Sequence, residues 1–410
     1  MNTKKQTKGP LSGLRVADFT WIGAGSYTTK ILSDFGAEVI KVESSTSLDP
    51  LRNTAPFFQG KPGVNRSGYF ADRNSNKKSI VLDLKKEKAQ DIARALIRKS
   101  DVVTNNFSPG TMDKLGLGYE RVSQDHKSLV YLSMSMQGSS GPHSHYVGFG
   151  LTIAALSGIQ HLSGPPDRAP VGTGTNYPDH VPNPSHAAFA LLSAIYYQRK
   201  TGIGQFIDFS QTEPSISLIG TTLIDSNVNE RIDKRMGNDN LQSAPRGAYP
   251  CRHGRTIAIA IFLDQQWSDL DNLLKISNQL ESRDWNSAKI RMEYRKELDA
   301  AISKITIDFD AQSLQNLLQS KSIPSGVASN IAELVENDPQ LNHRHHWIKL
   351  NHKEMGATIY NAPPIRLSRT NLIMENSAPL LGEHTDEVCI DLLGMSESEV
   401  KVLREQDIFV

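Results

Sequence analysis

The stretch from Thr173 to Gln205 places one acid directly before an apolar helix. Asp179 stands in a loop rich in Gly and Pro, and an apolar run typical of a buried helix begins near Ser185 and ends at Gly202. A carboxylate held at the mouth of a buried helix is placed for chemistry. The alternative is an ordinary loop aspartate that hydrogen-bonds within its own turn.

Few other side chains compete for a catalytic role. Cys251 and Cys389 have no neighbouring base in the sequence and no metal-site spacing. No G-x-S-x-G elbow, Walker loop or H-E-x-x-H motif occurs. The histidines between His343 and His352 fit no common metal spacing, so we expect no metal site. The remaining nucleophiles are carboxylates, which implies acyl, glycosyl or phosphoryl transfer.

The charges of the chain are nearly balanced, and its length allows two substantial hydrophobic cores. The 410 residues include 45 Lys plus Arg and 44 Asp plus Glu, so no net field attracts nucleic acid or a membrane surface. The polar N-terminus lacks a signal-peptide core, and no apolar run approaches the length of a membrane span. Two cysteines suit a reducing compartment, so a cytoplasmic protein is expected.

Strand and helix patterns alternate through the first half of the chain. Buried strands are expected over residues 14–20, 37–43, 77–84, 101–107 and 128–136, with helices over 26–35 and 85–99. This order predicts an α/β fold, a large Rossmann-like domain whose parallel sheet binds ligands at the carboxyl ends of its strands.

The turn after the first strand, Gly23-Ala24-Gly25, mimics a dinucleotide fingerprint, although Thr28 replaces the third glycine. A tight structural turn, an NAD site and a backbone contact to another nucleotide-bearing ligand all remain open at this point. The irregular residues 45–75 are rich in Pro, Gly, Asn and Ser, which is typical of a long functional loop.

A polar, turn-rich segment over residues 227–247 marks a domain boundary. A strand pair with its turn at His253-Gly254 follows, and helical patterns then predict a smaller α/β domain. We therefore expect a flexible tail over 1–10, the first part of the large domain over 11–225, the small domain over 226–325, and a C-terminal segment over 326–410 that returns to the large domain.

Six stretches, in this order, resemble the class III coenzyme A transferases, the formyl-CoA transferase, carnitine CoA-transferase and benzylsuccinate CoA-transferase type. They are LSGLRVADFT, ILSDFGAEVIKVES, NSNKKSIVLDLKK, SDVVTNNFSPGTMDKLG, RKTGIGQ and APLLGEHTDEV. The resemblance implies that the large domain binds CoA, that acyl-CoA is a substrate, and that no cofactor is tightly bound. It also implies an interlocked dimer, either a homodimer or a heteromer with a paralogous subunit.

The resemblance assigns roles to residues of this chain. Asp179 falls at the position of the family's covalent nucleophile, so CoA is expected to move from an acyl-CoA donor, with succinyl-CoA as one candidate, to an organic carboxylic acid through an aspartyl intermediate. The positions that correspond to family CoA contacts are Ile22, Gly23, Ala24, Leu82, Lys85, Asn106, Phe107, Lys114, Phe149 and Gly150.

Three departures from the family pattern bear on the substrates. Ser44 stands where an arginine often follows the second strand, so the nucleotide end of CoA is expected to be held differently. Phe149-Gly150 replaces Tyr followed by an acid, which removes one polar contact near the acyl group. The polyglycine lid of formyl-CoA transferases is replaced by the segment from Gly237 to Ser243, which favours an acyl group larger than formate or oxalate.

Two rival functions remain within this resemblance. An α-methylacyl-CoA racemase needs two acid/base groups at the substrate carbon, and racemases carry a histidine where this chain has Phe149, which cannot transfer a proton. A non-catalytic CoA-binding subunit of a heteromeric transferase is the other rival, and the presence of Asp179 argues against it.

Overall fold

The computed structural model describes residues 9–370 and 372–410, which form two compact units. The large unit holds residues up to 160, Thr173–Arg231 and Gln340–Val410, and the small unit holds His161–Gly172 and Ile232–Pro339. The flexible tail expected over residues 1–10 lies, except for its last two residues, outside the described residues.

A six-stranded parallel sheet in the order β3-β2-β1-β4-β5-β6 forms the centre of the large unit. The predicted α/β fold with a parallel sheet is therefore confirmed. The strand order reverses between β1 and β4, so these two strands form the topological switch point at which such sheets bind ligands. The strands are β1 Arg15–Asp18, β2 Glu38–Glu43, β3 Lys78–Val81, β4 Val102–Asn105, β5 Val130–Ser133 and β6 Gln205–Asp208.

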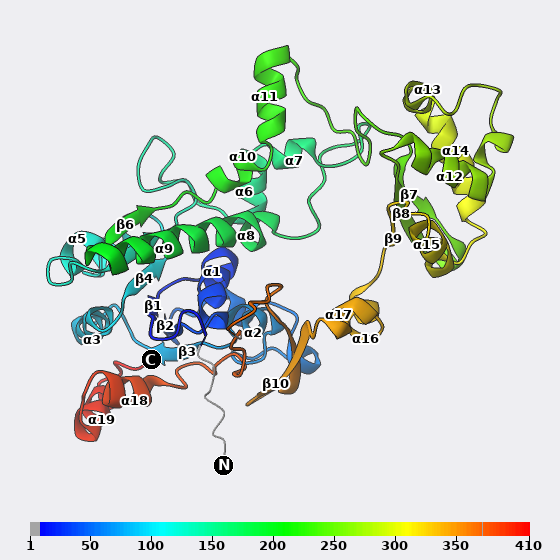
Figure 1. Cartoon of the computed structure of the whole chain (residues 1–410). Coiled ribbons are helices and arrows are strands. Elements are labelled where there is room, and N and C mark those ends of the chain that lie inside the picture. The colour runs from blue at the N-terminus through cyan, green and yellow to red at the C-terminus, as the bar shows by residue number, and fades with distance from the viewer. Residues whose placement is uncertain (1–8, 371) are drawn as a thin grey trace. The chain divides into compact units, whose positions relative to one another are not determined.

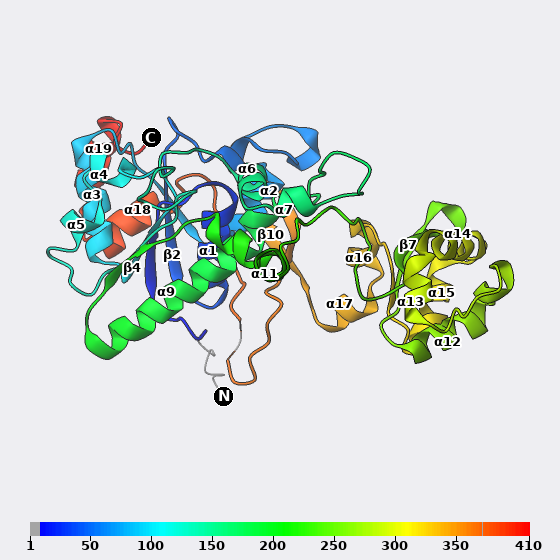
Figure 2. The same ribbon diagram turned by 90° about the horizontal axis from the view of Figure 1, so that it is seen from above.

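Helices cover both faces of this sheet. On one face, α1 (Ile22–Asp34) and α9 (Pro182–Thr201) lie side by side and bury the apolar side chains of β1, β4 and β5 that point toward them (Figures 1 and 2). On the other face, α3 (Glu87–Arg98) and the C-terminal α19 (Glu397–Glu405) share a core with β2 and β3. The central strands β4 and β5 are mostly buried, because helices cover both faces of the sheet there. The edge strand β6 is mostly exposed.

Helix α9 differs from its prediction at both its start and its burial. It begins at Pro182, three residues before Ser185, because a proline is well suited to the first helical position. It ends as predicted, with Gly202 in the left-handed conformation. Only one face of the helix is buried; on the other, Phe189 and Tyr196 are 74% and 65% exposed. The expectation of a helix buried all round is therefore wrong for this chain.

Shorter elements complete the large unit and the segments that flank it. A hairpin of β10 (Trp347–His352) and β11 (Gly356–Asn361) was not predicted. The other elements are η1 Pro50–Asn53, η2 Phe58–Gly60, α2 Gly68–Asn74, α4 Thr111–Lys114, α5 Tyr119–Val122, α6 Gly150–Leu156, α7 Ile159–Leu162, α8 Tyr177–His180, α10 Glu213–Ser217, α11 Gly220–Asn229, α17 Pro339–His343, α18 Thr385–Glu387 and η5 Val388–Leu392.

The small unit has its own sheet and core. Its antiparallel strands run in the order β7-β8-β9, and Trp267 and Leu298 are among the fully buried core residues. Its elements are β7 Arg246–Pro250, η3 Arg252–Gly254, β8 Thr256–Ala260, α12 Asp264–Leu274, η4 Ile276–Gln279, α13 Ala288–Glu293, α14 Arg295–Thr306, α15 Ala311–Gln319, β9 Ser325–Val327 and α16 Ile331–Glu336. Across the described residues of both units, none of the helices has the length and hydropathy needed to span a bilayer.

Candidate functional site

A cavity of about 330 Å³ lies at the switch point between β1 and β4. The segments that follow the carboxyl ends of β1, β4 and β5 supply most of its wall. Asp179 is the only charged side chain among the described residues that line it. The lining residues are Trp21, Ile22, Gly23, Ala24, Pro50, Asn106, Phe107, Ser108, Pro109, Ser135, Met136, Tyr146, Val147, Gly148, Phe149, Asp179 and Gln211.

Asp179 lies on the single turn α8, and its residue is only 3% exposed. Its Oδ2 accepts a hydrogen bond of 3.1 Å from the Gly150 backbone N–H, the first residue of α6. Burial raises the pKa of this carboxyl to about 6, and the Gly150 hydrogen bond offsets part of that rise. At neutral pH the carboxylate is therefore mostly ionised yet poorly solvated, which makes it a better nucleophile than a carboxylate in water.

Two glycines allow the backbone to approach Asp179 closely. A Cβ at position 150 would lie 2.8 Å from Asp179 Oδ2 and 2.7 Å from Asn176 Cβ. A Cβ at position 23 would lie 3.1 Å from Asp179 Cβ and 3.1 Å from His180 Cε1. The first contact is shorter than side chains permit, so Gly150 is required for the hydrogen bond that holds the carboxylate.

The neighbouring His180 is neutral and brings no positive charge to Asp179. Burial, together with the charge of Arg73, lowers the pKa of His180 to about 4. Its Nε2 lies 2.9 Å from the Tyr69 hydroxyl, and the two rings meet edge to face. His180, paired with Tyr69, therefore lies next to Asp179 in the chain without bringing a positive charge to it.

The turn after β1 is held in a strained conformation against β4. Asn106 clamps Trp21 on both sides: its Oδ1 accepts from the Trp21 N–H and its Nδ2 donates to the Trp21 carbonyl, each at 2.7 Å. The Phe107 ring packs edge to face on Trp21 with ring centroids 5.3 Å apart. Ile22 has φ 57°, a left-handed conformation that costs a β-branched residue on the order of 1–3 kcal/mol.

The structure brings most of the predicted site residues together with Asp179. Ile22, Gly23, Ala24, Asn106, Phe107 and Phe149 line its cavity, and Gly150 contacts the carboxylate directly. Leu82, Lys85 and Lys114 lie outside that lining: Leu82 is buried at the end of β3, while Lys85 and Lys114 are exposed. Their predicted role in binding CoA stays a prediction.

Ser44 lies at the end of β2, where it contacts the C-terminal segment. Its hydroxyl donates to the Val410 carbonyl at 2.9 Å. The ammonium of Lys86 donates to the carbonyls of Gln406 and Asp407, each at 2.9 Å. Lys86 is held by these bonds, whereas the side chain of the neighbouring Lys85 is exposed.

Sequence patterns alone missed several residues of the site. Pro50 lines the cavity from within the segment 45–75, where the composition had indicated a functional loop but no particular residue. Ser135 and Gln211 line it from the ends of β5 and β6, and Tyr69 reaches His180 from α2. Position at the carboxyl end of the strand predicted over 128–136 was the one signal available for Ser135.

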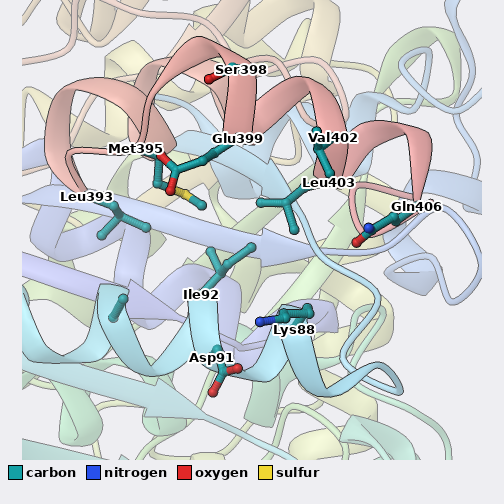
Figure 3. Close-up of a pocket in the computed structure, with 11 residues that line it drawn as sticks. Lys88, Asp91, Ile92, Leu393, Met395, Ser398, Glu399, Val402, Leu403 and Gln406 are labelled. Carbon is teal, nitrogen blue, oxygen red and sulfur yellow. The ribbon is translucent and has the colours of Figure 1, made fainter.

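A larger hollow of about 560 Å³ lies elsewhere in the large unit, between α3 and α19 (Figure 3). Ile92 and Leu403 face each other across it, and Lys88, Asp91 and Glu399 stand along its rim. These three charged residues are exposed. No group of three or more His, Cys, Asp or Glu residues able to hold a metal ion was found within residues 9–370 and 372–410.

Comparison with known proteins identifies the family and related folds. Residues 11–385 match the family described as CoA-transferase family III. The chain is 30% identical to succinyl-CoA–D-citramalate CoA-transferase of Chloroflexus aurantiacus over 96% of this chain and 97% of that protein. It is 28% identical to the mouse succinyl-CoA:glutarate CoA-transferase over 96% of this chain and 89% of that protein. A CAIB/BAIF family protein from Brucella suis has a crystal structure similar to this one, with a TM-score of 0.85, 29% identity and coverage of 94% of this chain and 100% of that chain.

Proposed function

The chain belongs to CoA-transferase family III, and from that premise we propose that it moves CoA from an acyl-CoA donor to a carboxylic acid through a covalent bond to Asp179. One observation carries the proposal. The only charged group among the described lining residues of the switch-point cavity is a buried carboxylate, fixed by one backbone N–H and raised in pKa to about 6.

The reaction follows from a carboxylate nucleophile. An Asp179 oxygen attacks the thioester carbonyl carbon of the donor, the C–S bond breaks, and CoA leaves as a thiolate with an aspartyl–acyl anhydride formed. The thiolate then attacks the aspartyl carbonyl, which releases the donor acid and leaves an aspartyl–CoA thioester. The acceptor carboxylate attacks the aspartyl carbonyl of this thioester, the C–S bond breaks, and a second aspartyl–acyl anhydride forms with release of CoA thiolate. The thiolate then attacks the acceptor acyl carbonyl, which forms the product thioester and frees the Asp179 carboxylate.

The protein's contribution is positioning, oxyanion stabilisation and exclusion of water. The anhydrides and thioesters exchanged are comparable in reactivity, so the chemistry requires no general acid. The first-turn backbone N–H groups of α1, at Gly23 and Ala24, have no partner within the helix and are suited to stabilise a developing oxyanion. The apolar walls from Met136 and Phe149 would limit hydrolysis of the anhydride.

Coenzyme A is expected to extend from this cavity toward the end of β3. Asn106 and Phe107 shape the cavity wall, and the exposed Lys85 and Lys114 would meet phosphate groups. The buried side chain of Leu82 would pack beneath the residues that border this CoA path. CoA enters as part of a substrate and leaves as part of a product.

Succinyl-CoA is the proposed donor and an organic acid larger than formate the proposed acceptor. The relatives named above are a succinyl-CoA–D-citramalate and a succinyl-CoA:glutarate transferase. In this chain Gly150 takes the place of an acid beside the acyl group, and the segment from Gly237 to Ser243 takes the place of a polyglycine lid. Both changes favour a bulky acceptor.

A dimer is part of this proposal, formed either by two copies or with a paralogous chain. The exposed apolar side chains of α9 and of α11, which include Phe189, Tyr196 and Val228, would be covered by such a partner. A related protein of Chloroflexus aurantiacus is named as an alpha subunit of a succinyl-CoA–L-malate transferase. Sedimentation equilibrium of the purified chain, alone, separates a homodimer from a chain that awaits another subunit.

The experiment that tests the function is a trap of the intermediate. The protein is incubated with succinyl-CoA and hydroxylamine, digested, and mapped by mass spectrometry. A hydroxamate on the peptide that contains Asp179 is the expected result, and CoA ester formation with a panel of carboxylic acids identifies the acceptor. A modified peptide that lies outside residues 173–185, or no modified peptide during active transfer, would contradict the assignment.

A further inference from the structure

A buried carboxylate outside the catalytic group holds the turn that lines the cavity. Asp49 is fully buried, and its Oδ1 accepts hydrogen bonds from the Ile22 N–H at 3.1 Å and from the Leu51 N–H at 3.0 Å. Ile22 and Pro50, the residue between Asp49 and Leu51, both line the cavity of Asp179. One oxygen atom therefore ties together two walls of the site that are far apart in the sequence.

The second oxygen of Asp49 is held by a buried cation. Lys41 Nζ lies 3.0 Å from Asp49 Oδ2, both side chains are fully buried, and the same ammonium donates to the Thr20 carbonyl at 2.5 Å. Burial alone would lower the pKa of Lys41, but the carboxylates of Asp49, Asp18 and Glu43 reverse this and hold the pKa above its usual value. Lys41 is therefore charged at neutral pH and stays close to the Asp49 carboxyl group.

The held turn is one that Ile22 would not adopt unaided. Its φ of 57° is unfavourable for a β-branched residue, and it persists only where surrounding contacts determine it. Those contacts act on three consecutive residues: Lys41 at the Thr20 carbonyl, Asn106 at both backbone groups of Trp21, and Asp49 at the Ile22 N–H. The next residue is Gly23, where an added Cβ would lie 3.1 Å from Asp179 Cβ.

We propose that Asp49 is a positioning residue for the coenzyme A ester: through its paired oxygens it fixes Ile22 in the left-handed conformation and so aligns the first turn of α1 with Asp179. The inference rests on the proposed function and adds a residue to it that touches neither substrate nor nucleophile. A buried ion pair contributes little net stability compared with an apolar pair, so positional specificity is a reason for its presence here.

The test is a coupling between Asp49 and Ile22. Glycine adopts a positive φ without cost, so Ile22→Gly removes the conformational strain that Asp49 supports. We expect Asp49→Ala to weaken CoA binding, measured by titration calorimetry, about tenfold in the native background and less than threefold in the Ile22→Gly background. A purely structural role of Asp49 predicts the same loss in both backgrounds.

Glu43→Gln is the matched control. Glu43 forms an equally buried pair with Arg52, at 2.8 Å, but makes no hydrogen bond to the turn. This variant should lower the thermal midpoint, change the dissociation constant of CoA less than twofold, and show no coupling to Ile22→Gly. If Asp49→Ala does not fold, Asp49→Asn replaces it, because Asn keeps an acceptor for the Ile22 N–H but loses the charge. CoA binding of Asp49→Asn is then measured in the native and the Ile22→Gly backgrounds, and the coupling should have the same sign.

The outcomes separate this inference from the proposed function. Equal losses in the two Ile22 backgrounds, or unchanged CoA binding in a folded Asp49 variant of a protein that transfers CoA, would overturn the positioning role alone. A native protein that neither binds CoA nor forms the Asp179 hydroxamate would overturn the function, and the positioning role with it.

Discussion

The two hollows of the large unit contain carboxylates in opposite environments. In the switch-point cavity, burial raises the pKa of Asp179 to about 6. On the rim of the α3–α19 groove, hydrogen bonds from the Ser396 backbone and hydroxyl lower the pKa of Glu399, which caps its own helix. The groove is the larger of the two, about 560 Å³ against about 330 Å³.

This difference shows why volume does not identify the reactive site. Glu399 is exposed and its charge is already stabilised by the helix cap, so its oxygens are weak nucleophiles. Asp179 has lost its water and gained one N–H donor, and it lies beside a strained backbone turn. Desolvation combined with enforced geometry is what distinguishes the smaller cavity.

Replacing Asp179 or Glu399 by its amide should give the largest difference in CoA transfer rate between the two hollows. Asp179→Asn keeps the shape and removes the nucleophile, so the rate of CoA transfer should fall at least 10³-fold, on the order seen when an essential catalytic group is removed. Calorimetric titration should show that CoA still binds. Glu399→Gln should retain transfer within twofold. A comparable loss in both variants would mean that the groove takes part in catalysis.

Crowding the close contact between Gly150 and Asp179 should have the next largest effect on kcat. Gly150→Ala places a Cβ 2.8 Å from Oδ2, so the carboxylate must move from its position. Because small displacements of a catalytic group cost about 10²-fold, kcat should fall by that order while the dissociation constant of CoA changes little. Gly148→Ala, on the same segment, tests general crowding. Native kcat in Gly150→Ala would show that the hydrogen bond is dispensable.

Burial of the Asp179 charge should cost stability as well as confer reactivity. A pKa shift from 3.8 to about 6 means that ionising Asp179 costs about 3 kcal/mol more in the folded state than in the unfolded state. Below pH 3.8 the carboxyl is protonated in both the folded and the unfolded state, so no difference arises. Stability is lost as pH rises toward 6, and Asp179→Asn should therefore raise the free energy of unfolding by about 2–3 kcal/mol at pH 7.5 and by nearly nothing at pH 4.

Urea unfolding at both pH values measures this gain. Glu399→Gln is the control, since the Gln side-chain oxygen can still accept the bond from the Ser396 N–H and stability should change little at either pH. An Asp179→Asn variant that is no more stable than the native protein at pH 7.5 would show that the carboxylate is better solvated than its burial indicates.

The pH dependence of transfer should report the same group. Only ionised Asp179 attacks the thioester, so kcat/KM should be level above pH 7 and fall tenfold per pH unit below about pH 6. An unperturbed aspartate would hold full activity to about pH 4. Rates measured between pH 4.5 and 8 with a non-titrating acyl-CoA donor decide between these profiles.

Local patterns predicted the parallel sheet and the stop at Gly202, and the family resemblance grouped Asn106 with the β1 turn. They did not predict the left-handed Ile22 or the buried Lys41–Asp49 pair, because a charge at the end of a strand has no local signature of its partner. Lys77 illustrates the same limit: it belongs to a lysine-rich stretch typical of a solvated face, yet it is fully buried against Asp18. Likewise, the largely apolar centre of α9 does not reveal from the sequence which of its faces is buried.

Substitutions inside the α3–α19 groove should have the smallest effect. Val402 is 49% exposed and Gln406 is exposed, so Val402→Ser and Gln406→Ala remove groove surface with little loss of core packing (Figure 3). Because neither residue lines the Asp179 cavity, kcat and the KM for acyl-CoA should stay within twofold of native. Steady-state kinetics with succinyl-CoA measure both. A fivefold or larger rise in KM would instead place part of the CoA path in the groove, and Lys88→Ala, on the facing helix, should then show the same rise.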